Sequence, residues 1–215
     1  MSIIGYIHVC QKGQWQRSFG MLIDSIKKTG LYENTKIIRL GVVNDTATLI
    51  DDPILKDDKF NIVYVGKSEE YERATLLHLR NKTESDDPTT MYYYLHTKGL
   101  RHFGNRNEQC ILDWINLMLY WNIEKWQIAV EKLQTYDTYG CNSLHNHYSG
   151  NYWWATKAHI MTLPDTIEPD YTAPERWVQV VRKNKCCIFK SGLEGMGHYS
   201  AVYPRSKYVM NNAIE

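Results

Sequence analysis

The sequence predicts an α/β protein in which a mixed, mostly parallel sheet is flanked by helices. The chain opens with a strand, a helix and two further strands, an order typical of sheets with helical crossovers. Two apolar, aromatic segments then adjoin polar turns, MYYYLHTKG at 91–99 and HYSGNYWWA at 147–155. Such strand ends hold the ligands of open α/β sheets. A chain of 215 residues can bury one substantial core, so we expect a single domain over residues 1–215, which can equally be one module of a longer polypeptide.

The first half of the chain alternates between β-rich and helical patterns. Residues 3–10 (IIGYIHVC) predict the opening strand, and residues 15–29 predict a helix because apolar side chains recur every three or four positions. Gly30 ends this helix at its C-cap. Residues 36–43 and 61–65 predict two more strands. These elements indicate a Rossmann-like opening.

The second half continues with longer helices. Residues 69–80 predict a helix that leads into a strand at 91–95, and residues 111–133 predict one long or two abutting amphipathic helices. The remaining elements are a short strand at 136–141, helices at 155–163 and 174–183, and a Gly- and Tyr-rich tail at 188–208 that folds back over the sheet as a loop.

Composition limits the classes of partner and compartment. The 25 basic and 24 acidic side chains give a formal net charge of +1, so no global field attracts nucleic acid. The five cysteines are odd in number and lack CxxC spacing, which favours a reducing compartment. No run approaches the roughly 20 apolar residues of a membrane span. We therefore expect a cytoplasmic protein without a membrane span.

The HTKG turn after the strand at 91–95 predicts a phosphate site. His96, Lys98 and Arg101 can neutralise a diphosphate, and Gly99 allows close approach of the backbone. His8, at the exit of the first strand, is suited to a base or ribose, although a packed strand histidine is an equal alternative. The absence of a GxGxxG motif argues against NAD or FAD.

The SGNYWW segment predicts a sugar site. Ser149 and Asn151 offer hydrogen bonds to hydroxyl groups, and Gly150 relieves crowding. Trp153 or Trp154 can stack on a pyranose. Because neighbouring strand residues point to opposite sides, we expect one indole to face the ligand and the other to lie in the core.

Six segments occur in the order YERATL (71–76), YLHTKG (94–99), DW (113–114), YDTYGCN (136–142), HYSGNYWWAT (147–156) and LP (163–164). In this order they resemble a family of GT-A-fold glycosyltransferases of large DNA viruses and bacteria, most closely the glycosyltransferase domain of a chlorella virus that builds capsid-protein glycans. The resemblance implies a UDP-sugar donor, a divalent metal (Mn²⁺ or Mg²⁺) and transfer of a hexose or deoxyhexose to a glycan hydroxyl with retention. A viral protein would act in the host-cell cytoplasm.

The resemblance also implies roles for individual residues. It assigns Tyr71, Arg73 and Thr75 to the nucleotide, and Asn142 and His147 to the sugar and acceptor.

One departure from the family concerns the metal. A DxD motif is usual at the strand end that here reads His96-Thr97-Lys98. The candidate ligands are His96, Asp87 in an acidic SDDP turn, and His198, because a C-terminal histidine often returns to the metal in this fold. An ordinary turn and a hydrogen-bonded loop histidine are the alternatives for Asp87 and His198.

A carboxylate is expected at the reaction centre, where it orients the acceptor or stabilises positive charge. Glu175 resembles the acidic residue that begins a late helix in several GT-A families, and Asp113 is a second candidate. Both also suit the first turn or cap of a helix without any chemistry. Two other classes stay open: a non-catalytic carbohydrate-binding module, and a nucleotide-diphosphate hydrolase, for which the acidic metal cluster is not found.

Overall fold

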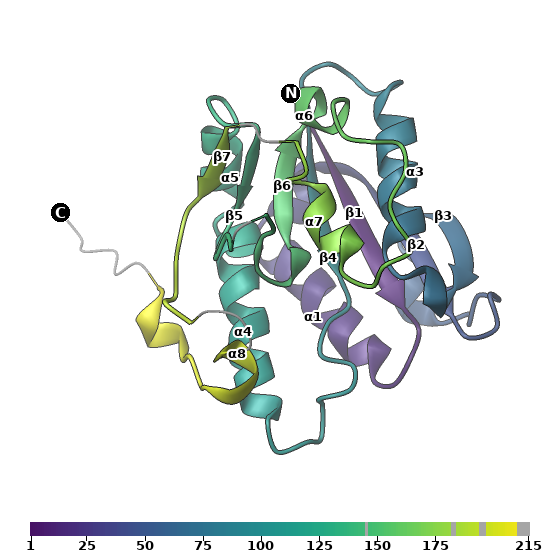
Figure 1. Ribbon diagram of the computed structural model, residues 1–215. Coiled ribbons are helices and arrows are strands. Elements are labelled where there is room, and N and C mark those ends of the chain that lie inside the picture. Colours follow the sequence, from purple (N-terminus) through teal and green to yellow (C-terminus); the bar gives the residue numbers. More distant parts are fainter. Residues whose placement is uncertain (145, 182–183, 194–196, 210–215) are drawn as a thin grey trace.

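A seven-stranded sheet in the order β3-β2-β1-β4-β6-β5-β7 forms the centre of the computed structural model, which describes residues 1–144, 146–181, 184–193 and 197–209 (Figure 1). β1 pairs in parallel with β2 and β4, and β2 pairs in parallel with β3. β6 runs antiparallel to its neighbours β4 and β5. The strands are β1 (Ser2–Cys10), β2 (Thr35–Asn44), β3 (Phe60–Lys67), β4 (Thr90–His96), β5 (Thr138–Gly140), β6 (Trp153–Thr156) and β7 (Lys185–Cys187).

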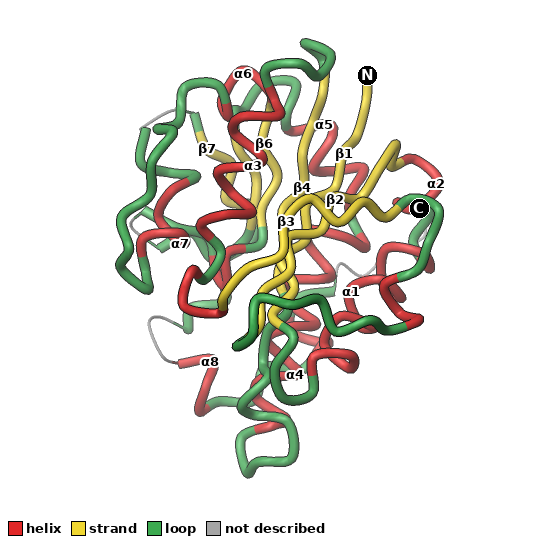
Figure 2. The backbone as a smooth tube through the Cα atoms, turned by 90° about the vertical axis from the view of Figure 1, so that its right-hand side faces the viewer, coloured by secondary structure: helices red, strands yellow, loops and turns green. Residues whose placement is uncertain are grey.

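Helices cover both faces of this sheet. Figure 2 shows α3 and α7 on one side of the strands and α1 and α5 on the other. The described helices are α1 (Trp15–Lys28), α2 (Leu31–Asn34), α3 (Arg73–Thr83), α4 (Glu108–Leu119), α5 (Trp126–Lys132), α6 (Lys157–Ile160), α7 (Ala173–Trp177) and α8 (Gly197–Ser200), with a π-helical turn at Tyr120–Glu124. The predicted fold class, a mixed, mostly parallel sheet flanked by helices, is confirmed.

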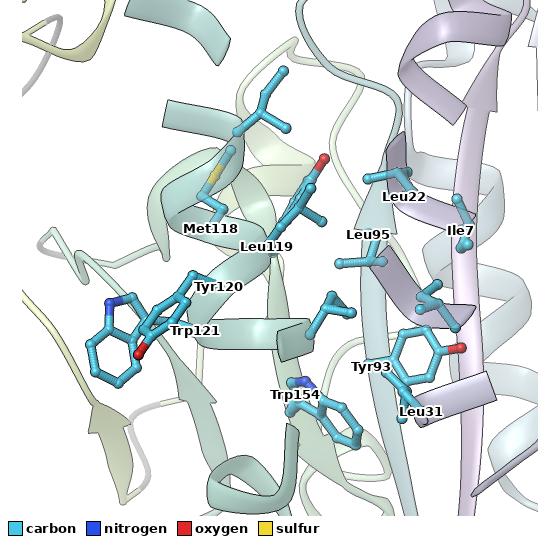
Figure 3. Packing of buried hydrophobic residues seen from close by; sticks show 14 of the residues in the cluster. Ile7, Leu22, Leu31, Tyr93, Leu95, Met118, Leu119, Tyr120, Trp121 and Trp154 are labelled. Atoms are coloured by element: carbon cyan, nitrogen blue, oxygen red, sulfur yellow. The ribbon is translucent and has the colours of Figure 1, made fainter. Parts of the chain in front are cut away.

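The alternation of side chains along β4 and β6 divides the core in two. Tyr93 and Trp154 pack with α1 and α4 in the larger cluster (Figure 3). Tyr94 and Trp153 pack on the opposite face with α3, α6 and α7, and their rings are stacked 5.0 Å apart. Both indoles are fully buried because helices cover both faces.

Two predicted helices are shorter in the structure, and one strand was not predicted. The helix predicted at 155–163 is shorter, because Ala155 still belongs to β6 and pairs with Tyr92 and Thr138. The helix predicted at 174–183 ends at Trp177, and residues 182–183 lie outside the described part. β7 was not predicted.

The C-terminal tail lies against α4 and the π-helical turn. Its Phe189 stacks on Trp121, and its His198 stacks on Trp114. The expectation that the tail covers the sheet as a loop is therefore wrong, since aromatic side chains anchor it to helices and part of it forms α8. No helix among the described residues is both long and apolar enough to cross a bilayer.

Candidate active site at the ends of β1 and β4

The candidate site lies where the connections of the sheet change direction. From β1 the chain moves to β2 and β3 on one side, and it returns to β4 on the other side of β1. In open α/β sheets a crevice forms at such a switch point, outside the carboxyl ends of the strands. His8 of β1 and His96 of β4 are register partners at this end. The two strand exits that the sequence assigns to one site therefore lie side by side.

Both imidazoles at the switch point are neutral. His8 Nδ1 lies 2.9 Å from Thr75 Oγ1, and His96 Nε2 donates to the Gly150 carbonyl at 2.7 Å. Desolvation lowers the pKa of His8 to about 4. Desolvation and the nearby Lys98 ammonium lower the pKa of His96 to about 4. The imidazoles therefore supply hydrogen-bonding atoms but no positive charge at neutral pH.

This neutrality predicts that stability decreases in mild acid. The ordinary histidine pKa of 6.5 applies in the unfolded chain, so the unfolded state binds more protons than the folded state as the pH falls from 6.5 towards 4. Each histidine then costs about 2 kcal/mol of unfolding free energy between pH 7 and pH 5. Urea unfolding at both pH values should show a loss about 2 kcal/mol larger for the wild type than for His96→Gln. Equal losses in the two proteins would contradict the assignment.

Lys98 is the cation at the centre of this site. Its Nζ lies 4.2 Å from the centre of the Trp114 ring, a cation–π contact. Its backbone N–H donates to Ser18 Oγ at 2.8 Å, which fixes the start of the turn. Desolvation lowers the pKa of Lys98, and the carboxylates of Glu175 and Glu72 oppose that shift. The ammonium thus lies in a poorly solvated setting, within electrostatic range of two carboxylates.

Glu72 is a central residue that the sequence reasoning missed. Its Oε2 accepts hydrogen bonds from Tyr94 Oη and Asn151 Nδ2, each at 2.7 Å, and its Oε1 lies 3.9 Å from His96 Nδ1. Its side chain is 12% exposed. It directly precedes α3 and follows Tyr71, whose φ of 51° is unusual for a residue with a side chain. The YER segment was assigned to the nucleotide, but its carboxylate was passed over.

The residues assigned to the nucleotide line one side of the site. Tyr71 meets Tyr171 edge to face at 5.0 Å, and Arg73 Cζ lies 5.7 Å from the centre of the Tyr71 ring. Arg73 Nη1 is buried without a hydrogen-bond partner. The Thr75 hydroxyl is hydrogen-bonded to His8 Nδ1. Tyr171 lies two residues before α7, which carries Glu175.

The SGNYWW segment forms a short turn at Ser149–Asn151 followed by the start of β6. Ser149 Oγ accepts from Trp114 Nε1 at 2.7 Å, and the Gly150 carbonyl accepts from His96. Asn151 is fully buried, and it donates to Glu72 and accepts from Trp153 Nε1.

The prediction that one indole faces a sugar is wrong. Trp153 and Trp154 are both 0% exposed, one on each covered face of the sheet. The prediction that Asn151 contacts a sugar is also wrong, because its side chain is buried and its Oδ1 accepts a hydrogen bond from Trp153.

Asp113 has a structural role instead of a catalytic one. Its Oδ1 accepts from Gln109 Nε2 at 2.7 Å and its Oδ2 accepts from the backbone of Tyr203 at 2.9 Å. The side chain is buried, so the carboxylate anchors the tail to α4. The alternative role, a cap at the start of the helix, is also wrong because Asp113 lies inside α4.

Two other assigned residues connect the tail to the sheet. Asn142 Nδ2 lies 3.2 Å from His198 Nε2, and Asn142 Oδ1 accepts from the backbone of Ser191. Ser191 Oγ lies 3.0 Å from the same His198 nitrogen. The hydrogen-bonded loop histidine, one of the two alternatives for His198, describes this arrangement. His147 pairs through its backbone with Leu144 in a tight turn.

The described residues do not fit a metal ion held by protein side chains alone. Asp87 lies before the first residue of β4, at the end of the strand opposite to His96. Its carboxylate accepts from Thr89 in an ordinary turn. Asp87 is therefore wrong as a metal ligand for this site. Within the described ranges, no three His, Cys, Asp or Glu side chains gather as a metal-binding group. The Lys98 ammonium further disfavours a divalent cation here.

Comparisons with known proteins give the fold. No family model matches the chain. No curated protein matches it either. Among solved structures it is similar to Rv0371c from Mycobacterium tuberculosis H37Rv, with a TM-score of 0.51, 10% identity and 88% of each chain covered. It is also similar to Rv0371c in complex with manganese, with a TM-score of 0.48, 10% identity and coverage of 93% of this chain and 96% of that one.

A third similar structure comes from Desulfovibrio desulfuricans G20 and is provisionally named a nucleotide-diphospho-sugar transferase. Its TM-score is 0.48, with 12% identity and coverage of 88% of this chain and 81% of that one. The three structures come from two bacterial proteins. At 10–12% identity these similarities concern the α/β fold and not the activity.

Proposed function

We propose that the chain is a glycosyltransferase that moves a sugar from a UDP-sugar donor to a hydroxyl group of a glycan. The observation that carries this proposal is the set of polar groups at the β1/β4 switch point, where ligands of open α/β sheets bind. This set includes the Lys98 ammonium, two carboxylates and two neutral imidazoles. Sugar transfer needs these kinds of group, because a diphosphate leaves and a hydroxyl attacks.

In this proposal Lys98 stabilises the charge that develops on the leaving diphosphate. An ammonium in a poorly solvated site acts more strongly than one in water. Glu175 lies on the acceptor side, where its carboxylate orients the attacking hydroxyl. His8 and Tyr71 would contact the nucleotide from the β1 exit and from the start of α3.

The sequence resemblance supports the finer parts of the proposal. It favours UDP over other nucleotides, a hexose or deoxyhexose as the transferred sugar, and a retaining outcome. It also favours a role in glycosylation of a viral capsid protein. No step in the proposed reaction passes through a metal, because the described side chains do not fit one.

The alternative of a non-catalytic sugar-binding module loses its main support. Such modules present aromatic rings to the flat face of a sugar. Here Trp153 and Trp154 are buried in the two halves of the core. The third class, a nucleotide-diphosphate hydrolase, would need an acidic metal cluster, and the described ranges contain none.

A thermal-shift panel of UDP, GDP and CMP tests the proposal. A nucleotide at 100 times its Kd stabilises the folded state by about 2.7 kcal/mol, which raises the melting temperature by roughly 5–10 °C for a chain of this size. We expect UDP to give the largest increase. The same panel with Mn²⁺ measures whether binding needs a metal. Absence of any shift at millimolar nucleotide would refute the proposal.

A further inference from the structure

Two hydrogen-bond acceptors face each other at the end of β4. Glu72 Oε1 and His96 Nδ1 are 3.9 Å apart, beyond the length of a direct hydrogen bond. Both side chains are slightly open, with exposed fractions of 12% for Glu72 and 13% for His96. The Lys98 ammonium and the Glu175 carboxylate are close enough to influence the same imidazole. The pair therefore belongs to the candidate site.

The other hydrogen bonds of the two residues determine where the protons are. A carbonyl can only accept, so the 2.7 Å contact with the Gly150 oxygen requires the proton of His96 on Nε2. In the neutral ring Nδ1 then carries a lone pair. Glu72 Oε2 already accepts from Tyr94 and Asn151, which fixes the carboxylate and directs Oε1 towards Nδ1. In this tautomer His96 Nδ1 brings no proton to the gap between the two atoms.

This arrangement is selective for a hydrogen-bond donor. A phosphate oxygen would be repelled by the carboxylate and by the imidazole lone pair. His96 is therefore withdrawn as a diphosphate contact, and Lys98 keeps that role. A divalent cation would need more ligands than these two atoms, and it would lie beside an ammonium. Sugar hydroxyls carry donors and no charge, so they match the pair.

We propose that Glu72 Oε1 and His96 Nδ1 bind hydroxyl groups of the transferred sugar and thereby select the donor. This inference rests on the proposed function and adds the subsite for the sugar. The subsite adjoins Lys98, as expected for a sugar attached to a diphosphate. Tyr94 and Asn151 act as positioning residues, since they hold the carboxylate without facing the sugar.

Conservative substitutions can remove the acceptors while keeping the surrounding hydrogen bonds. In Glu72→Gln the amide oxygen can still accept from Tyr94 and Asn151, and the amide nitrogen then presents a donor where Oε1 presented an acceptor. In His96→Gln the amide nitrogen can still donate to the Gly150 carbonyl, and the Nδ1 lone pair is lost. Glu131→Gln is the matched control, because it makes the same change at an exposed carboxylate of α5 that pairs with Lys132 away from the site.

Calorimetry with UDP and with UDP-glucose, UDP-galactose and UDP-N-acetylglucosamine tests the inference, with thermal melts to verify folding. For the sugar nucleotide that binds the wild type most tightly, we expect Kd to rise about 10-fold in Glu72→Gln and in His96→Gln. The Kd of UDP alone should change less than about 3-fold in both. Glu131→Gln should bind the sugar nucleotide and UDP within about 3-fold of the wild type.

Several outcomes would overturn the inference. Equal weakening of UDP and the sugar nucleotide in both variants would place the pair at the nucleotide, and no weakening of either would exclude the pair as a subsite. Stabilisation of the wild type by Mn²⁺ alone, lost in Glu72→Gln, would identify a metal site. A wild type that binds neither UDP nor any sugar nucleotide would refute the proposed function, and the inference would fail with it.

Discussion

Replacement of Lys98 by methionine is expected to lower the turnover of the sugar nucleotide by about 100-fold or more, the usual cost of removing one preorganised charge at a reacting oxygen. Methionine keeps an apolar stem on the Trp114 ring, where Lys98 Nζ lies 4.2 Å from the ring centre. The fold should therefore persist. Release of UDP from the donor, measured with and without a glycan acceptor, gives the turnover.

The control for this experiment is Lys36→Met. Lys36 is exposed and lies near the start of β2, at the end of the strands opposite to the candidate site. The Lys36→Met variant removes one positive charge, as Lys98→Met does, but leaves the candidate site unchanged. Turnover of Lys98→Met within about 3-fold of this control would contradict the role of the ammonium.

Removal of the Asp86 carboxylate is expected to give the largest loss of stability. Asp86 accepts hydrogen bonds from both terminal nitrogens of Arg39, at 3.0 and 3.1 Å, and from Tyr92 Oη at 2.9 Å. The Arg39 side chain is only 8% exposed. Asp86→Ala leaves a buried guanidinium without its counterion, which typically costs 3–5 kcal/mol. Urea unfolding at pH 7 measures this loss.

Asp87→Ala is the matched control for the neighbouring position. Asp87 is exposed, and its carboxylate accepts from the backbone and the hydroxyl of Thr89 within one turn. We expect a cost below about 1 kcal/mol. Similar losses for the two alanine variants would show that the ion pair with Arg39 does not dominate. Neither aspartate is expected to alter UDP binding, because both precede β4 at its far end.

The order of the strands and helices was predictable because it depends on local periodicity. Apolar spacing in 15–29 and the aromatic run in 91–95 correspond to α1 and β4. Short elements were less predictable. β7 has only three residues, and β6 continues into a segment with helical spacing, so sheet pairing overrides the local pattern there.

The polar groups of the candidate site were only partly predictable. The strand exits with His8, His96 and Lys98 could be recognised from the abrupt change to polar residues. The burial of Trp153 depends on α6 and α7, which follow later in the chain, and no local pattern reveals that cover. Glu72 was missed for a similar reason, because its partners Tyr94 and Asn151 are distant in sequence.

The central claim is that a sugar nucleotide binds at the carboxyl ends of β1 and β4 with its diphosphate on Lys98. A crystal structure of the protein with UDP tests it most directly. The account predicts diphosphate oxygens about 3 Å from Lys98 Nζ, with the uridine towards His8 and Tyr71. UDP bound at another part of the sheet, with Lys98 still resting on Trp114, would contradict it.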